Sequence, residues 1–369
     1  MRFLVLVLLT TLLLDARAND IGDACLADLD ALPDFLVTND AGARDNAVRL
    51  QDVLGKAFEH ARALAREATG DDDCAEALRT YLRAFRHGHL AIAPIRPGGA
   101  DAFEPPTMSD PMAPRFRVLG TNTALLTLPT FGDRYASLID TLVAEHRQEI
   151  VSRPYLIVDV RRNGGGSDAS YAPLLPLFAA NITRTIGAEF LATADNIAAS
   201  QAVCKLPATS TEACRKFMTP VIEAMRAAPA GTYVLPDSER AVDVETPEHV
   251  LENPRRIAVL IDHACGSSCE EFVLAVRQSF KVKTFGRPTY GSLDYSNLRP
   301  HDLPSGRRRL FYATSRSLRL PLFPVDAAGI APDQFLPPPA NEAAFDAEIE
   351  TVRRILEFEA AARTYRRRR

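Results

Sequence analysis

The sequence has no excess of positive charge, few lysines and no long run of apolar residues. Its 43 Lys and Arg residues are outnumbered by 47 Asp and Glu residues, which gives a formal net charge of -4. A chain of this charge offers no basic field for holding phosphates, so we expect no nucleic-acid partner. No stretch reaches the roughly 20 consecutive apolar residues that a membrane helix needs, so we expect no stable membrane insertion. The 369 residues are otherwise typical of a globular protein with two or three domains.

The first 18 residues differ from the rest of the chain. Met1 and Arg2 precede an apolar run from Phe3 to Leu14, and Ala16-Arg17-Ala18 follows it. This is the layout of a cleavable secretory signal, and the apolar run is too short to span a bilayer. We therefore expect cleavage before Asn19 and an exported protein, periplasmic or secreted.

Six cysteines fall into neighbouring pairs along the chain, and export would place them where disulfides persist. Nearest-neighbour pairing is our hypothesis among the possible connectivities. It joins Cys25 with Cys74, Cys204 with Cys214, and Cys265 with Cys269. Metal binding is the competing interpretation, but the spacings are not those of a zinc site and no histidine cluster accompanies them. We expect neither a metal nor a cofactor.

The chain divides by pattern into a helical part and an α/β part. After the signal, residues 19–93 have the periodicity of amphipathic helices, and 94–114 are rich in Pro and Gly, as in a linker. Residues 115–350 alternate apolar strands with helices, which predicts an α/β core. A helical segment at about 187–245 interrupts this alternation and is interpreted as an insert, and 351–369 form a C-terminal helix and basic tail.

Two loops of the core combine residues suited to acyl-transfer chemistry. Gly164, Gly165 and Gly166 follow a buried strand and precede a helix, where glycine N–H groups can face an anion. The second loop contains Ser268, again between an apolar strand and a helix, where a nucleophile is exposed and the next N–H can donate to an oxyanion. The alternative is structural: Ser268 and Glu271 also form a capping box, in which the serine only caps the helix.

Four segments in order resemble the C-terminal processing, or tail-specific, serine peptidases. They are Tyr155–Ser167 (YLIVDVRRNGGGS), Ala258–Phe272 (AVLIDHACGSSCEEF), Phe285–Gly291 (FGRPTYG) and Ala327–Asp333 (AAGIAPD). The resemblance covers residues 119–337 and implies a crotonase-like α/β core, here with an N-terminal helical domain. It also implies that Ser268 is the nucleophile, with Glu271 three residues beyond it.

The expected catalytic base departs from the bacterial members of this family. Their lysine would stand at Ser292, and none of the five lysines in the chain matches that position. The core also resembles the tricorn protease branch, which takes a histidine from upstream. By that resemblance His89 is the base, because neutral imidazole accepts a proton near neutral pH, with the rate falling at pH 6 to 7. His263 is the alternative base. Asp326 is the acid expected to orient the base, and Glu271 is the alternative acid.

The oxyanion hole is assigned to the N–H of Cys269 and that of Gly165 or Gly166. Residues 94–114 are too few for the PDZ module that family members often carry, so tail specificity is not implied. The sequence thus predicts a serine endopeptidase acting on proteins or peptides. Two alternatives stay open: a non-catalytic scaffold that binds an apolar ligand or peptide, and an acyl-CoA enzyme, which export disfavours.

Overall fold

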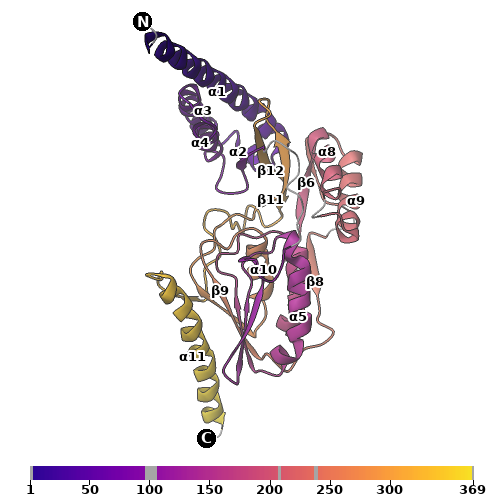
Figure 1. Ribbon diagram of the computed structural model, residues 1–369. Coiled ribbons are helices and arrows are strands. Elements are labelled where there is room, and N and C mark those ends of the chain that lie inside the picture. The colour runs from indigo at the N-terminus through magenta and orange to yellow at the C-terminus, as the bar shows by residue number, and fades with distance from the viewer. Residues whose placement is uncertain (1–2, 96–105, 207–208, 237–239, 368–369) are drawn as a thin grey trace. The chain divides into compact units, whose positions relative to one another are not determined.

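The computed structural model describes residues 3–95, 106–206, 209–236 and 240–367, and within these ranges the side chains of residues 20–358. The chain forms two compact units, whose elements are labelled in Figure 1. The first unit comprises residues 1–102, 188–241 and 294–320, and the second comprises 103–187, 242–293 and 321–369. Each unit is therefore assembled from three stretches of sequence.

A six-stranded sheet forms the centre of the second unit. Its strands in spatial order are β13 (Gln334–Phe335), β10 (Val282–Gly286), β9 (Arg256–Ile261), β4 (Tyr155–Asp159), β3 (Thr123–Thr127) and β2 (Arg115–Leu119). All neighbours pair in parallel except β2, which is antiparallel to β3. Every residue of β4 is buried, as expected for a parallel strand that is covered on both faces.

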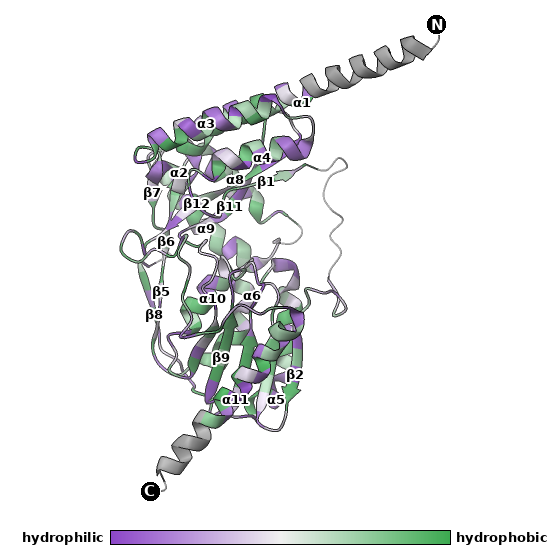
Figure 2. Ribbon diagram, turned by 90° about the vertical axis from the view of Figure 1, so that its left-hand side faces the viewer, coloured by the Kyte–Doolittle hydropathy of each residue, from purple (hydrophilic) through white to green (hydrophobic). Residues whose placement is uncertain are grey.

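Helices cover both faces of this sheet, because alternate strand residues point to opposite sides. Leu156 and Val158 join a core with α5 (Ala136–Val151) and α10 (Ser268–Val276). Ile157 and its neighbours instead pack against α11 (Glu342–Arg367). The result is a three-layer α/β/α arrangement, and Figure 2 shows the hydrophobic residues of β9 at its centre.

Shorter elements complete the second unit. The chain from the end of β4 to the insert contains α6 (Asp168–Tyr171) and α7 (Leu175–Phe178), and η1 (Asp133–Tyr135) and η2 (Ala172–Leu174) are 3-10 turns. β5 (Thr183–Ile186) and β8 (Val242–Glu245) form a separate antiparallel ribbon.

The first unit joins a helical cluster to a second sheet. Its first helices are α1 (Phe3–Asn39), α2 (Ala41–Asn46), α3 (Gln51–Arg66) and α4 (Asp71–Leu82). Its sheet contains β1 (Ala91–Pro94), β6 (Ala188–Ala192), β7 (Thr232–Val234), β11 (Tyr295–Asp302) and β12 (Arg308–Ser317). α8 (Ala194–Val203) and α9 (Glu212–Ala227) pack on β6.

The three predicted disulfides are confirmed. Cys25 is bonded to Cys74, Cys204 to Cys214, and Cys265 to Cys269. The predicted alternation of strand and helix after residue 115 is also confirmed as an α/β fold. Among the helices described, none has an apolar stretch long enough to cross a membrane.

The units differ from the domain boundaries that the sequence suggested. We expected a helical domain at 19–93 and a separate insert at about 187–245, but the structure groups both with residues 294–320. The reason is pairing: β12 is hydrogen-bonded to β1, β6 and β11. The last helix spans Glu342–Arg367, so its first turns lie within the range that the sequence assigned to the core. Residues 96–105 of the expected linker and Arg368 and Arg369 of the basic tail lie outside the described residues.

Candidate active site

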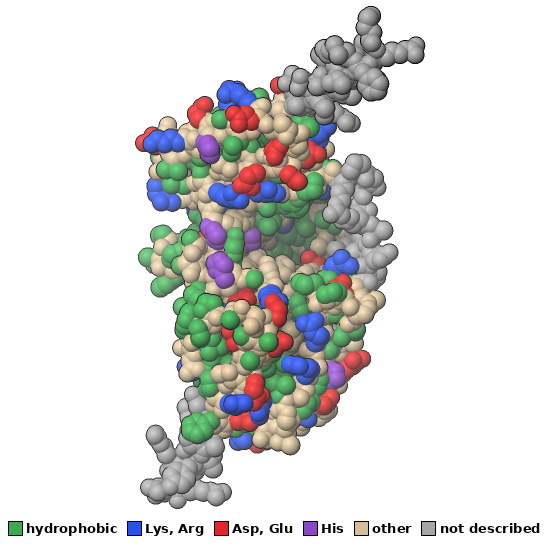
Figure 3. Space-filling model, turned by 60° about the vertical axis from the view of Figure 1, so that its left-hand side comes forward, with side chains coloured by type: hydrophobic (Ala, Val, Ile, Leu, Met, Phe, Trp, Pro, Cys, Tyr) green, Lys and Arg blue, Asp and Glu red, His purple; other side chains and the backbone are tan. Residues whose placement is uncertain are grey.

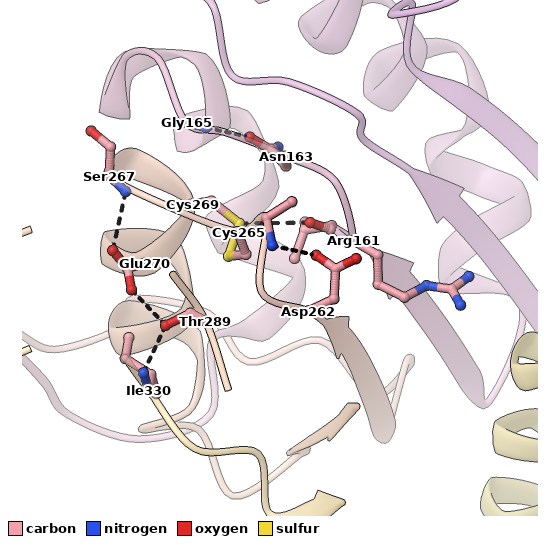
Figure 4. The surroundings of a disulfide bond; sticks show 12 residues. Arg161, Asn163, Gly165, Asp262, Cys265, Ser267, Cys269, Glu270, Thr289 and Ile330 are labelled. Carbon is pink, nitrogen blue, oxygen red and sulfur yellow. Dashed lines mark hydrogen bonds between the residues drawn. A yellow bond between two sulfur atoms is a disulfide. The ribbon is translucent and has the colours of Figure 1, made fainter. Parts of the chain in front are cut away.

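The turn between β9 and α10 holds Ser267 in an unusual backbone conformation. Its φ is 56° and its ψ is -127°, a region that residues other than glycine rarely adopt. A serine in a sharp turn from strand to helix is the arrangement that exposes the hydroxyl of a nucleophile. The Ser267 N–H is fixed by the main-chain oxygen of Ser292 at 3.1 Å and by Glu270 Oε2 at 3.2 Å. Figure 4 shows the Ser267 side chain pointing away from Glu270.

A disulfide brackets this turn. Cys265 and Cys269 are fully buried, and the three residues between them include Ser267. The oxygen of Cys265 also accepts a hydrogen bond from the N–H of Tyr290 at 2.8 Å. The turn is thus closed covalently and attached to the segment that follows β10 (Figure 4).

The Glu270 carboxylate connects the serine turn to that same segment. It is fully buried and accepts hydrogen bonds from Thr289 Oγ1 at 2.5 Å and from the N–H groups of Gly291 and Ser292, each at 2.8 Å. Thr289 Oγ1 in turn accepts from the N–H of Ile330 at 2.7 Å. A buried carboxylate with this many donors is fully satisfied, so Glu270 fixes both loops at once.

The glycine turn after β4 lies directly against the serine turn. A Cβ added to Gly165 would stand 2.8 Å from Ser267 Cβ and 3.0 Å from the Ser268 nitrogen. One added to Gly166 would stand 2.3 Å from the main chain of Phe131. Both glycines have positive φ, 95° and 143°, so these positions exclude larger residues for two reasons. The main-chain oxygen of Asn163 also accepts from the N–H of Gly266 at 3.2 Å.

Two of the N–H groups expected to form the oxyanion hole donate hydrogen bonds within the protein. The N–H of Cys269 donates to the oxygen of Gly266 at 3.0 Å, and that of Gly165 donates to Asn163 Oδ1 at 2.9 Å. By contrast, no main-chain oxygen of the described residues, outside the regular helices and strands, accepts a hydrogen bond from the N–H of Ser268 or of Gly166. These two donors belong to the two turns that face each other.

Ser268 and Glu271, the expected nucleophile and its partner, lie one residue beyond the turn. Ser268 is the first residue of α10, is 8% exposed, and donates its hydroxyl to the oxygen of Gly166 at 3.1 Å. Glu271 is partly exposed, and its N–H donates to the oxygen of Ser267 at 3.1 Å. The capping box is likewise one residue earlier, with Ser267 at the N-cap and Glu270 at the third position.

His89 lies in the first unit, at the end of a tight turn. Its φ is 50°, and its Nδ1 is hydrogen-bonded to the main-chain oxygen of Tyr295. A carbonyl oxygen only accepts, so Nδ1 carries the proton and Nε2 of the neutral ring keeps a free lone pair. Burial lowers the pKa of His89 to about 4. The imidazole is therefore neutral at neutral pH, the state that a general base requires.

The other candidates for proton transfer have different surroundings in the second unit. His263 is exposed on the turn after β9, with its ring centre 5.5 Å from that of Tyr290. Asp326 Oδ1 accepts from the N–H of Leu293 at 2.6 Å. Ser292, at the position of the family's lysine, is buried.

No lysine of the chain takes the place of the family's lysine base. The main-chain oxygen of Lys281 accepts from the N–H of Ile257, at the start of β9, whereas Ser267 follows the end of that strand. The two positions are thus at opposite ends of β9, and Lys281 Nζ donates to the main-chain oxygen of Leu251 at 2.8 Å. Lys283 is exposed on β10, and Lys56, Lys205 and Lys216 are exposed in the first unit. In the described part of the chain, no group of three or more potential metal-ligating side chains could hold a metal ion.

An α/β fold with a serine in a left-handed turn and a facing glycine turn defines a serine hydrolase. Comparison with known proteins gives the family. The model of peptidase family S41 matches residues 122–334, more than half of the chain. The chain therefore belongs to peptidase family S41 and is a serine-type peptidase.

Solved structures give the same fold. A structure of mature CPAF in complex with lactacystin has a TM-score of 0.61 at 12% identity, over 92% of this chain and 98% of the other. A second structure of mature CPAF has a TM-score of 0.56 at 12% identity, over 91% and 96% of the two chains. Identities this low establish likeness of fold alone. Among curated protein sequences, none matches the chain.

Proposed function

We propose that this protein is an exported serine endopeptidase with a crotonase-like core, and that Ser267 rather than Ser268 is its nucleophile. The observation that carries this proposal is the left-handed backbone of Ser267, with φ of 56°, at a disulfide-bracketed turn from strand to helix. A strained conformation of this kind persists only where the surrounding structure enforces it, and such sites are concentrated at catalytic centres. The hydroxyl of Ser268 is less suited, because it is nearly buried and donates to Gly166.

The chemistry assigned to these groups is acyl transfer. The Ser267 oxygen attacks the carbonyl carbon of the peptide bond, and its proton passes to Nε2 of the base. The N–H groups of Ser268 and Gly166 stabilise the oxyanion that forms, and losing one such donor costs on the order of 100- to 1000-fold in kcat. The protonated base then gives its proton to the leaving amine. Water hydrolyses the acyl-enzyme by the same steps, which regenerates the Ser267 hydroxyl.

The base we propose is His89, a residue of the first unit. Two features support it: the proton on Nδ1 leaves Nε2 as the acceptor, and burial keeps the ring neutral by lowering the pKa of His89 to about 4. His89→Gln should abolish turnover, whereas the matched variant His263→Gln should retain it. Equal activities of the two variants would remove the assignment.

Export is proposed from the signal-like N-terminus and the three disulfides. Disulfides persist in oxidising compartments and are rare in the cytosol. N-terminal sequencing of the protein recovered from outside the cytoplasm should begin at Asn19. Recovery of uncleaved protein from the cytoplasm with six free thiols would contradict export.

A direct test of the proposed function is the turnover of casein together with inactivation by a fluorophosphonate. The account expects hydrolysis by the wild-type protein and stoichiometric inactivation, with neither seen for Ser267→Ala. If wild type and Ser267→Ala react equally with the probe and neither hydrolyses casein, the scaffold alternative takes the place of the enzyme.

A further inference from the structure

The imidazole of His89 is oriented by a main-chain carbonyl instead of a carboxylate. In a serine hydrolase triad the Nδ1–H of the histidine normally donates to a buried acid, which fixes the tautomer and stabilises the charged ring. Here that place is taken by the oxygen of Tyr295 on β11. A carbonyl fixes the tautomer equally well, but it brings no negative charge. Asp326, the acid expected from the sequence, is therefore not the acceptor at Nδ1.

A buried ion pair contacts the main chain of the His89 turn. The side chains of Arg86 and Asp40 are 5% and 0% exposed and form two hydrogen bonds, of which Nη2 to Oδ2 measures 2.8 Å. Arg86 Nη2 also donates to the main-chain oxygen of His89 at 2.8 Å. The guanidinium thus reaches the histidine through its peptide group, and it lies 5.3 Å from the centre of the Tyr295 ring.

Asp40 anchors this pair to the rest of the unit. It caps α2 by accepting from the N–H of Ala43 at 2.6 Å, and it accepts from the N–H of Ala313 on β12 at 2.8 Å. The Asp40 carboxylate therefore holds Arg86 against both a helix and the sheet. A bidentate pair that accepts these extra hydrogen bonds is held in a single geometry. Exposed ion pairs between long side chains are not held in this way.

We propose that the Asp40–Arg86 pair positions His89 for catalysis, acting through the main-chain oxygen of His89 instead of through its ring. The proposal rests on the assignment of His89 as the base. Neither Asp40 nor Arg86 touches the reacting atoms, so both are positioning residues. The pair holds the main chain of the His89 turn, and the Tyr295 carbonyl holds the imidazole ring of His89.

The charged groups around His89 give this role a distinctive signature. Arg86 lowers the pKa of His89 and Asp40 raises it. Other titratable groups at the turn are His87, two residues before His89, and Tyr295, whose phenol donates to Asp45 on α2 at 3.3 Å. Removing the charge of Asp40 should therefore lower the pKa of His89 further, because Arg86 is left unbalanced. A purely structural pair would change stability and leave kcat of the folded protein unchanged.

The test compares Asp40→Asn with Arg86→Lys. Asp40→Asn should reduce kcat by on the order of 10- to 100-fold with little change in KM, because a displacement of about 1 Å at a catalytic group costs this much. Arg86→Lys keeps the charge but loses the planar fork, so kcat should fall while the pKa of His89 stays near that of the wild type. NMR titration of the His89 ring reads that pKa without any need for activity.

The matched control is Asp28→Asn. Asp28 forms a comparable buried pair with Arg308 in the same unit, at 3.1 Å and with side chains 0% and 2% exposed, and the other hydrogen bonds described for these two side chains are to Ser305 and Asp71. If Asp40→Asn fails to fold, the double variant Asp40→Asn/Arg86→Gln leaves no unpaired charge and should still lower kcat.

The outcomes separate the positioning proposal from the proposed function. If Asp40→Asn and Arg86→Lys have the same kcat as Asp28→Asn, the positioning role is overturned, even where the pKa of His89 has shifted. If His89→Gln retains full activity, the base assignment fails; a changed His89 pKa in Asp40→Asn would then support only the electrostatic coupling.

Discussion

The turns that carry Ser267 and His89 each contain a residue with positive φ but are stabilised differently. Both residues have positive φ, 56° and 50°. The Ser267 turn is closed by a disulfide spanning four positions and by Glu270, three residues away. The His89 turn depends on Asp40 and Tyr295, which are 46 residues from Arg86 and 206 residues from His89. One turn is fixed largely by local sequence, and the other only by the completed fold of its unit.

The largest effect should come from the serine doublet. Ser267→Ala removes the proposed nucleophile and should lower kcat by roughly 10⁴- to 10⁶-fold, the range seen when a catalytic serine is removed. Ser268→Ala removes only the hydroxyl that donates to Gly166 and keeps the N–H, so it should lose less than about 10-fold. Turnover of a peptide substrate by the two variants decides between them, and the reverse order would move the nucleophile to Ser268.

Glu270 should be the next most sensitive position of the serine turn. Glu270→Gln replaces a buried oxygen by an amide group that cannot accept from all of its present donors, Thr289, Gly291, Ser292 and Ser267. Leaving donors unsatisfied should cost about 2 to 4 kcal/mol of unfolding free energy and lower kcat. Urea unfolding measures the loss. Glu271→Gln, at a partly exposed position, is the control and should lose under about 1 kcal/mol.

The Cys265–Cys269 and Cys25–Cys74 disulfides should differ in their effects on stability and on kcat. Removing Cys265 and Cys269 opens a short loop and should cost only about 2 kcal/mol, whereas removing Cys25 and Cys74, 49 residues apart, should cost about 4 kcal/mol by the loop-entropy estimate. The effects on kcat should be reversed, because only the first bridge brackets Ser267. Double Ala variants, measured by thermal unfolding and by turnover, test this. Equal kcat values would show that the bridge does not position the serine.

The pH dependence of stability tests the burial of His89. Because burial lowers the pKa of His89 to about 4 in the folded state, the unfolded state binds the extra proton below about 6.5 and stability falls as pH drops from 6.5 to 4. At most about 3 kcal/mol is lost in this window, and His89→Gln should lose less. The acid limb of kcat/KM should lie near pH 4, below the pH 6 to 7 expected for an unperturbed histidine.

Much of the fold follows from sequence pattern alone. The apolar runs of β4 and β9, the helices that follow them and the neighbouring cysteine pairs all predicted what is found, because each signal is local. The division into units was missed, since the pairing of β12 with β1 and β6 joins distant segments.

The nucleophile that we propose lies one residue before the serine that the sequence favoured. Two serines followed by Cys and two glutamates allow two alignments of a serine with a glutamate three positions on, and only the backbone of Ser267 distinguishes them. The earlier pair, Ser267 and Glu270, was an available signal in the sequence. The Asp40–Arg86 pair carried no such signal, because its contacts with the His89 turn arise from tertiary packing. The low pKa of His89 has the same origin.

The surface is consistent with the balanced charge of the sequence. On the face drawn in Figure 3, Lys and Arg side chains are interspersed with Asp and Glu. Substrate selection by a field of one sign is therefore not expected on this face.

The central claim is that the Ser267 hydroxyl performs the attack, and mass-spectrometric mapping of the protein after reaction with a fluorophosphonate tests it most directly. The account predicts one phosphonylated residue, Ser267, and no modification of Ser267→Ala. A phosphonate found on Ser268, or an unchanged extent of labelling in Ser267→Ala, would contradict it.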